Sequence, residues 1–217
     1  MASESKFSIS EAFSFGWKAM KENFVFFLKA LITTGLIQII LNACYEKTIK
    51  TFFPAGVIFY IASVLAGCIF YMGYVTISLK FCDKEEKKFS DIFSSYPLFF
   101  NFLFASIVNG IVVFIGLLLL IVPGIILLIR LRYFGYFIVD KSCGPIEALK
   151  KSFELTKGST WNLFVLVLAQ IGVVILGFIA LFIGLFAAIP TTMVADAFVY
   201  RALLNSKEPS QGVTPSV

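Results

Sequence analysis

Four long apolar stretches restrict this chain to a membrane-spanning helical fold. They cover residues 24–43, 52–81, 98–139 and 161–204, with polar segments between them. A helix needs about 20 apolar residues to cross the hydrocarbon layer of a bilayer. The first two stretches therefore predict one span each, whereas the last two are long enough for two.

Prolines divide the two longest stretches. Pro123 and Pro190 lie within them, and proline starts helices well but interrupts them badly. Each stretch therefore predicts a tight hairpin of two helices turned near its proline, which makes the fold all-α: a polytopic membrane bundle of six transmembrane helices. The predicted spans are about 24–43, 52–81, 98–121, 123–140, 161–185 and 189–204, in a single membrane domain of residues 1–204. The polar remainder, 205–217, predicts a disordered tail.

The composition agrees with a membrane protein. The chain is 59% hydrophobic and only 14% charged, whereas soluble proteins carry roughly 25% charged residues. The net charge of +5 comes from short basic clusters between apolar runs, so nucleic acid is not expected as a partner. The four cysteines form no CxxC motif and no histidine is present. We therefore expect no metal site and no cofactor.

The distribution of lysines predicts the orientation. With six spans, the N-terminal segment, the loops 82–97 and 141–160 and the tail share one side, which carries eleven lysines. The opposite side carries Lys47 and Lys50. Basic residues accumulate on the cytoplasmic side. We therefore expect a protein integral to the cytoplasmic (inner) membrane, with both termini in the cytoplasm.

Three of the cytoplasmic segments resemble one another. Each places an acidic residue ahead of apolar residues at helical spacing: SISEAFSFGWKAMKENF (8–24), KFSDIFSSYPLFF (88–100) and CGPIEALKKSFELTKGSTW (143–161). The interval from Glu11 to Pro54 is 43 residues, that from Glu147 to Pro190 is the same, and that from Asp91 to Pro123 is shorter, at 32. The pattern indicates a threefold repeat of interfacial helix, span, proline turn and returning span. Chance similarity among cytoplasmic loops is the alternative.

The three segments predict short amphipathic helices at about 8–22, 89–97 and 145–157. Their expected caps are Ser8, Ser90, and Gly144 with Pro145. In the third helix, Ile146, Leu149 and Phe153 share the predicted apolar face.

Basic amphipathic helices bury their apolar face in the bilayer and present their lysines to anionic lipid head groups. The candidate head-group contacts are Lys18, Lys21, Lys87, Lys88, Lys150, Lys151 and Lys157. A sharper hypothesis makes the three helices a docking ring for a protein partner at the membrane.

Longer motifs resemble a family of bacterial membrane proteins. They are GYVTISLKFCDKEEKKFSDIF (73–93), VPGIILLIRLRYFGYFIVDKSCGPIEALKKSFELTKGSTWNL (122–163) and DAFVYRALL (196–204). They are similar to the YciC-like inner-membrane proteins and to the membrane domain attached to some glycerophosphoryl diester phosphodiesterases. The resemblance covers nearly the whole chain. It implies a six-helix membrane module, and it implies no reaction for this segment.

The clearest ionisable residues inside the predicted spans are Arg130, Arg132 and Asp196. Such residues cost about 2.5–3.5 kcal/mol each on insertion scales, so they face protein or water. Counted from Pro123 and Pro190, Arg130 and Asp196 lie at nearly equal depth. We therefore predict an Arg130–Asp196 pair, with Arg132 as the alternative partner and otherwise directed toward the head groups. The pair would be structural; alternatively, Arg130 would line a wet cavity and bind an anion.

The sequence argues against an enzyme. It has no histidine, no P-loop, no GxSxG motif and a single clear intramembrane carboxylate, Asp196, so the usual groups for proton transfer are missing. The leading hypothesis is a non-catalytic membrane protein that scaffolds partners or organises lipid. The alternative is a small transporter or channel that binds a charged solute or lipid head group at Arg130 and Asp196. Because no glycine or proline interrupts a span at its middle, the broken helices of transporters are not expected.

Overall fold

The computed structural model describes residues 7–180 and 183–207, which form an all-α fold. Six helical segments are long and apolar enough to cross a membrane, which confirms the predicted fold class. The elements are α1 (Ile9–Glu22), α2 (Phe24–Ile49), α3 (Phe53–Cys82), η1 (Phe89–Phe93), η2 (Tyr96–Leu98), α4 (Phe99–Leu119), α5 (Ile121–Leu131), α6 (Phe134–Lys141), α7 (Pro145–Leu155), α8 (Thr160–Ile179) and α9 (Leu185–Lys207). Helices α5 and α6 together make the fourth span.

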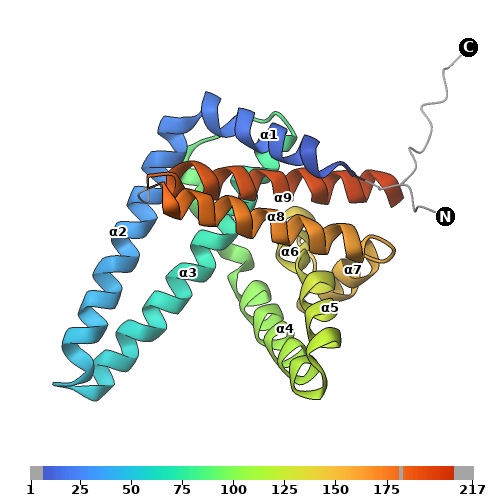
Figure 1. The fold of residues 1–217 in the computed structure, drawn as a ribbon. Helices are drawn as coiled ribbons and strands as arrows, with labels where there is room; N and C mark the ends of the chain where they lie inside the picture. Colours follow the sequence, from blue (N-terminus) through green and yellow to red (C-terminus); the bar gives the residue numbers. More distant parts are fainter. Residues whose placement is uncertain (1–6, 181–182, 208–217) are drawn as a thin grey trace, which may run out of the picture.

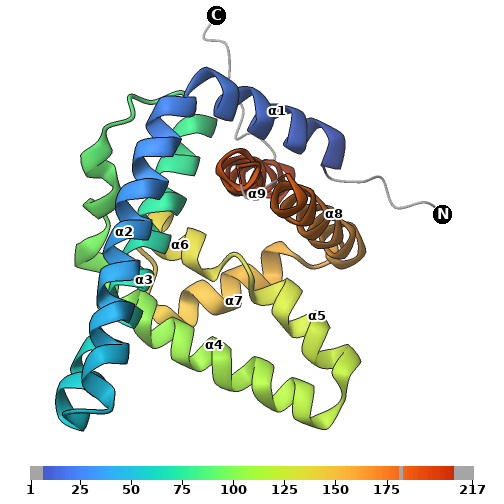
Figure 2. The ribbon, with the colours of Figure 1, turned by 60° about the vertical axis from the view of Figure 1, so that its left-hand side comes forward.

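Three helical hairpins diverge from a shared hub. Figure 1 shows the pairs α2–α3, α4–α5 and α8–α9 pointing in different directions, and Figure 2 shows α8 and α9 almost end-on. The centre of the hub is a buried aromatic cluster of Tyr133, Tyr136, Phe137 and Tyr200. Away from the hub the hairpins expose large apolar side chains such as Leu118, which is 75% exposed. A bilayer would cover such surfaces.

The interfacial helices join neighbouring hairpins in a ring. Helix η1 packs against α3, α7 packs against α6, and α1 packs against α9, which links the last hairpin back to the first. At the α3–η1 joint, Gly73 lies so close to the backbone of Ile92 that any Cβ would collide with it. This cyclic packing agrees with the threefold repeat indicated by the sequence.

Two prolines lie where the hairpin prediction places them. Pro54 lies in the first turn of α3 and Pro123 in the first turn of α5. Both positions suit proline, because the first-turn amides of a helix have no intrahelical acceptor.

The predicted turn at Pro190 is wrong. Pro190 lies inside α9, which begins at Leu185. The chain instead reverses between α8 and α9, where Gly177 and Gly184 approach so closely that a Cβ on either would crowd the other. Two glycines without side chains permit this tight return.

The second interfacial segment also differs from the predicted α-helix at 89–97. It consists of the two short 3₁₀ turns η1 and η2, and Pro97 within η2 cannot donate a backbone hydrogen bond. The Asp91 carboxylate, rather than Ser90, caps η1 by accepting a hydrogen bond from the Lys88 amide at 2.8 Å.

The other two caps form as expected. The Ser8 hydroxyl accepts a hydrogen bond from the Glu11 amide, and α7 begins at Pro145 directly after Gly144. Helix α9 continues to Lys207, three residues beyond the expected boundary at Leu204. The rest of the predicted tail, 208–217, lies outside the described residues.

Candidate functional site

The intramembrane ion pair forms between Arg132 and Asp196. The Arg132 Nη2 donates to Asp196 Oδ1 at 2.6 Å and to Oδ2 at 2.7 Å. Gln170 of α8 completes the cluster, because its Oε1 accepts from Arg132 at 3.0 Å and its Nε2 donates to Asp196 Oδ1 at 2.9 Å. The arginine and aspartate side chains are only 16% and 21% exposed. Opposite charges and an amide thus pair inside the bundle.

The pair predicted from the sequence, Arg130 with Asp196, is therefore wrong. Asp196 pairs with Arg132, which was the alternative partner. The depth estimate counted Asp196 from Pro190, but α9 begins at Leu185. Asp196 lies eleven residues after Leu185, and Arg132 lies eleven residues after Ile121, the first residue of α5. The two charges are level once the true helix starts are used, and Arg132 does not extend toward the head groups.

Arg130 of α5 instead binds Phe153 of α7. Its guanidinium carbon lies 3.4 Å from the centre of the Phe153 ring, and its Nη2 donates to the Phe153 carbonyl at 3.0 Å. Phe153 is 37% exposed. This arginine combines a cation–π contact with a bond to a main-chain acceptor.

The fourth span is broken beside the ion pair. Helix α5 ends at Leu131 and α6 begins at Phe134, without a glycine or proline between them. Helix α7 provides the missing partners: the Ser152 hydroxyl donates to the Arg130 carbonyl at 2.9 Å and accepts from the Tyr133 amide at 3.1 Å. The expectation of uninterrupted spans is wrong because a distant segment satisfies the freed backbone.

Helix α7 is accordingly more deeply packed than a helix lying among head groups. Ser152 and Thr156 are fully buried, and Thr156 also donates to the Arg130 carbonyl, at 3.1 Å. Of the predicted apolar face, Leu149 is buried whereas Ile146 and Phe153 are exposed. The buried face is therefore centred on small and hydroxyl-bearing residues, since these allow close contact with the α5–α6 break.

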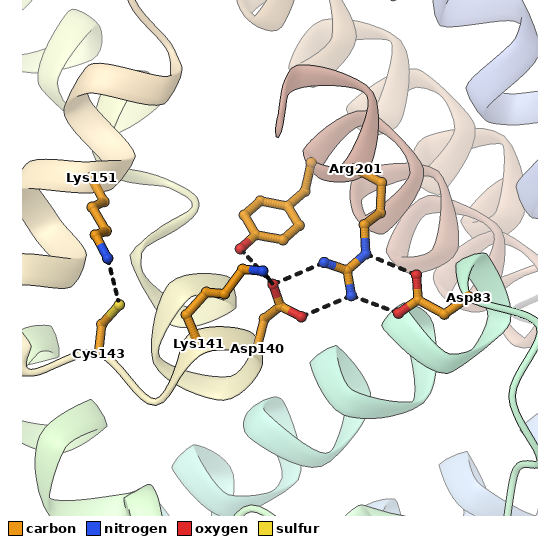
Figure 3. A network of polar contacts seen from close by, with 7 residues as sticks. Asp83, Asp140, Lys141, Cys143, Lys151 and Arg201 are labelled. Carbon is orange, nitrogen blue, oxygen red and sulfur yellow. Dashed lines mark hydrogen bonds and ion pairs between the residues drawn. The ribbon is translucent and has the colours of Figure 1, made fainter. Parts of the chain in front are cut away.

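A second arginine cluster joins the ends of three spans (Figure 3). Arg201 of α9 donates from Nε and Nη2 to Asp83, just after α3, at 2.9 and 2.5 Å. It also donates from Nη1 and Nη2 to Asp140 of α6, both at 2.8 Å. Tyr200 adds a hydrogen bond to Asp140 at 3.1 Å. The sequence reasoning missed Arg201 and Asp83; the available signal was a charged residue near the end of each returning span.

The predicted head-group lysines occupy varied surroundings. Lys151 pairs with Glu147 at 2.7 Å and lies 3.4 Å from Cys143 Sγ, while the Lys87 ammonium lies 4.5 Å from the Phe81 ring centre. The Lys151 ammonium lowers the pKa of Glu147. The other five are exposed: Lys18, Lys21, Lys88, Lys150 and Lys157.

Two grooves run between the spans. One, with a volume of about 600 Å³, lies between α2, α3 and the start of α9, and its wall includes Leu31, Gly35, Phe70 and Ile189. The other, of about 410 Å³, lies between α5 and α8 and includes Arg132. Within the described residues, no group of three or more His, Cys, Asp or Glu side chains could hold a metal ion.

Residues 5–207 match the model of a family described as "Protein of unknown function (DUF975)". The chain belongs to this family. It is similar to the uncharacterized proteins Rv2560 of Mycobacterium tuberculosis and Mb2590 of Mycobacterium bovis, each 26% identical over 92% of this chain and 69% of the relative. No solved structure matches. Family membership is consistent with the YciC-like resemblance, whereas the comparisons give no support for the phosphodiesterase relation.

Proposed function

We propose that this protein is a non-catalytic scaffold of the cytoplasmic membrane that organises lipid between its diverging hairpins, with both termini in the cytoplasm. The observation that carries the proposal is the 600 Å³ groove between the first and third hairpins. All three helices that line it are membrane-span candidates. In a bilayer, the groove therefore opens among lipid tails.

The wall of this groove suits a hydrocarbon chain. Leu31, Phe70 and Ile189 contribute apolar side chains. Two polar groups beside them, Thr34 and Tyr74, bond to each other at 2.7 Å, and Gln38 exchanges hydrogen bonds with Ser63. Because these polar groups have protein partners, the groove offers little to water and fits an acyl chain.

The charges support an organising role over a chemical one. Arg132 pairs with Asp196, and Gln170 bonds to both. Exposed lysines on α1 and α7 can contact anionic head groups. A reporter fused to the C-terminus tests the orientation, and an extracytoplasmic signal would refute it.

A glycine substitution tests the groove. Gly35 lines it, and a Cβ at this position meets no atom within 4 Å. Gly35→Leu should therefore fill the groove without a clash and displace lipid, seen by native mass spectrometry as fewer retained phospholipids. Gly110→Leu, on α4 and equally open, is the matched control and should retain the wild-type number. Equal retention in all three proteins would refute the proposal.

A second candidate is a small transporter or channel for a charged solute. The observation that favours it is the break between α5 and α6 beside Arg132, whose Nη1 is buried without a hydrogen-bond partner among residues 7–180 and 183–207. Broken helices near the middle of the membrane form ion and substrate sites in transporters. Solute flux in proteoliposomes that is abolished by Arg132→Gln would favour this candidate over the scaffold.

A further inference from the structure

We propose that a basic pocket between α6, α7 and α9 binds the phosphate group of an anionic amphiphile. The pocket has a volume of about 390 Å³. Three lysines converge on it from three elements: Lys141, Lys151 and Lys207. The inference rests on the proposed role in lipid organisation and assigns it a specific head-group site.

The location matches the boundary of the bilayer. Lys141 and Lys207 are the last residues of the fourth and sixth membrane-span candidates. Lys151 faces the same pocket from α7 and is 42% exposed. Lysines at span ends reach the head-group layer, and basic pockets between helices on the cytoplasmic side bind anionic head groups.

The lining of the pocket has an excess of positive charge, because its three lysines face one carboxylate among the lining residues, that of Glu154. Lys151 also pairs with Glu147 at 2.7 Å. Asp140, the acidic neighbour of Lys141, already accepts two hydrogen bonds from Arg201 and one from Tyr200, and its distance to the Lys141 ammonium is 3.7 Å. Lys207 donates to the main-chain carbonyl of Glu154. A phosphate has several acceptor oxygens, so it can accept hydrogen bonds from more than one of these ammonium groups.

The apolar residues that line the pocket favour an amphiphile as its ligand. Phe137, Leu155 and Leu204 line it beneath the lysines. Phe137 and Leu155 are already buried, whereas Leu204 is partly exposed. A free phosphate would leave Leu204 exposed, whereas the glycerol and first methylenes of a phospholipid would cover it. Occupancy would tie α6 of the second repeat to α7 and α9 of the third.

The test uses the full-length protein in detergent and two probes, short-chain phosphatidylglycerol and inorganic phosphate, with short-chain phosphatidylcholine as the neutral reference. Binding is followed by native mass spectrometry and by the shift in unfolding temperature. The pocket variant carries three substitutions together, Lys141→Gln, Lys151→Gln and Lys207→Gln. It should bind phosphatidylglycerol more weakly than the wild type, by about fivefold for each lysine removed.

The control combines Lys18→Gln, Lys88→Gln and Lys157→Gln, which removes the same charge from lysines outside the pocket. Because Lys18, Lys88 and Lys157 are themselves candidate head-group contacts, a second control changes Lys47, Lys50 and Lys84, which are exposed, lie outside the pocket and are not among those candidates, to glutamine. This second control should retain wild-type affinity and is the one compared with the pocket variant, and a pocket variant with the three lysines changed to arginine should also retain it and reports on folding. Equal losses in the pocket and control variants would overturn the proposal, as would wild-type protein that does not distinguish the two lipids. If inorganic phosphate alone binds with the same lysine dependence, the phosphate site stands and its ligand is soluble.

The groove and the pocket can fail separately. If Gly35→Leu retains its lipid while the three-lysine variant loses phosphatidylglycerol, the groove proposal fails and the pocket survives. The reverse result removes the pocket and leaves the groove.

Discussion

The two arginine clusters differ in their depth in the membrane and in how their charges are balanced. Arg132 lies at mid-span and is paired with one carboxylate and one amide, so its cluster is neutral. Arg201 lies at the ends of three spans and bridges two carboxylates, Asp83 and Asp140, and the second positive charge comes from Lys141, which lies 3.7 Å from Asp140 and is 49% exposed. Deep in a membrane, a net charge is expensive, whereas at its boundary water and head groups screen it. Depth therefore decides whether the charges of a cluster are balanced by buried partners alone or also by an exposed lysine.

The largest expected effect comes from removing the carboxylate of the deep cluster. Asp196→Leu leaves the Arg132 guanidinium buried without an opposite charge, which should cost about 3–5 kcal/mol in the free energy of unfolding. Steric-trap or denaturant unfolding in bicelles measures the loss. The double variant Arg132→Leu with Asp196→Leu should recover most of it, because both charges are gone. If Arg130→Leu rescues Asp196→Leu equally well, the Arg132 pairing is wrong.

The boundary cluster should respond less strongly. Arg201→Ala removes hydrogen bonds to both carboxylates but exposes them to water, so we expect a loss of about 1.5–3 kcal/mol. Arg201→Lys should recover only part, since an ammonium cannot reproduce the planar fork. A double-mutant cycle with Asp140→Asn should show stronger coupling than one with Asp83→Asn, because Asp140 is 11% exposed and Asp83 is 33% exposed. The opposite order would contradict the depth argument.

A neutral contact near the deep cluster should have a smaller effect. Ser152→Ala removes the hydroxyl that serves the Tyr133 amide and the Arg130 carbonyl. Thr156 still donates to that carbonyl, so we expect a loss of about 1–2 kcal/mol. Hydrogen exchange should show faster exchange at the Tyr133 amide, with little change at the α4–α5 turn. Unaltered exchange at Tyr133 would mean that Ser152 does not support the break.

The smallest effect is expected at the exposed Glu147–Lys151 pair of α7. The folded-state pKa of Glu147 lies below its ordinary value because of Lys151, so the contribution to stability is present above the ordinary pKa and lost as the pH falls through the folded pKa. Glu147→Gln should therefore reduce this pH dependence slightly, with no resolvable change in unfolding temperature at neutral pH, since exposed pairs contribute little. A destabilisation as large as that of Arg201→Ala would show that the exposure of an ion pair does not determine how much it contributes to stability.

The wrong partner predicted for Asp196 came from a small error in the predicted start of the last helix. The six spans follow from the lengths of the apolar stretches, and Pro54 and Pro123 mark helix starts as expected. Pro190 does not, and the resulting five-residue offset for Asp196 selected Arg130 over Arg132. The break between α5 and α6 carries no local sequence signal, because its hydrogen-bond partners lie on α7.

The sequence by itself determined that this chain is a six-span helical membrane protein with charged residues at mid-span and a repeated order of elements. Apolar length and the cost of burying charge act locally along the chain, so they can be read from it. The tertiary structure alone decided that Asp196 pairs with Arg132, that Ser152 supports a broken span and that Arg201 joins Asp83 to Asp140. These choices depend on helix rotation and on contacts between residues up to 118 positions apart, which no local pattern specifies.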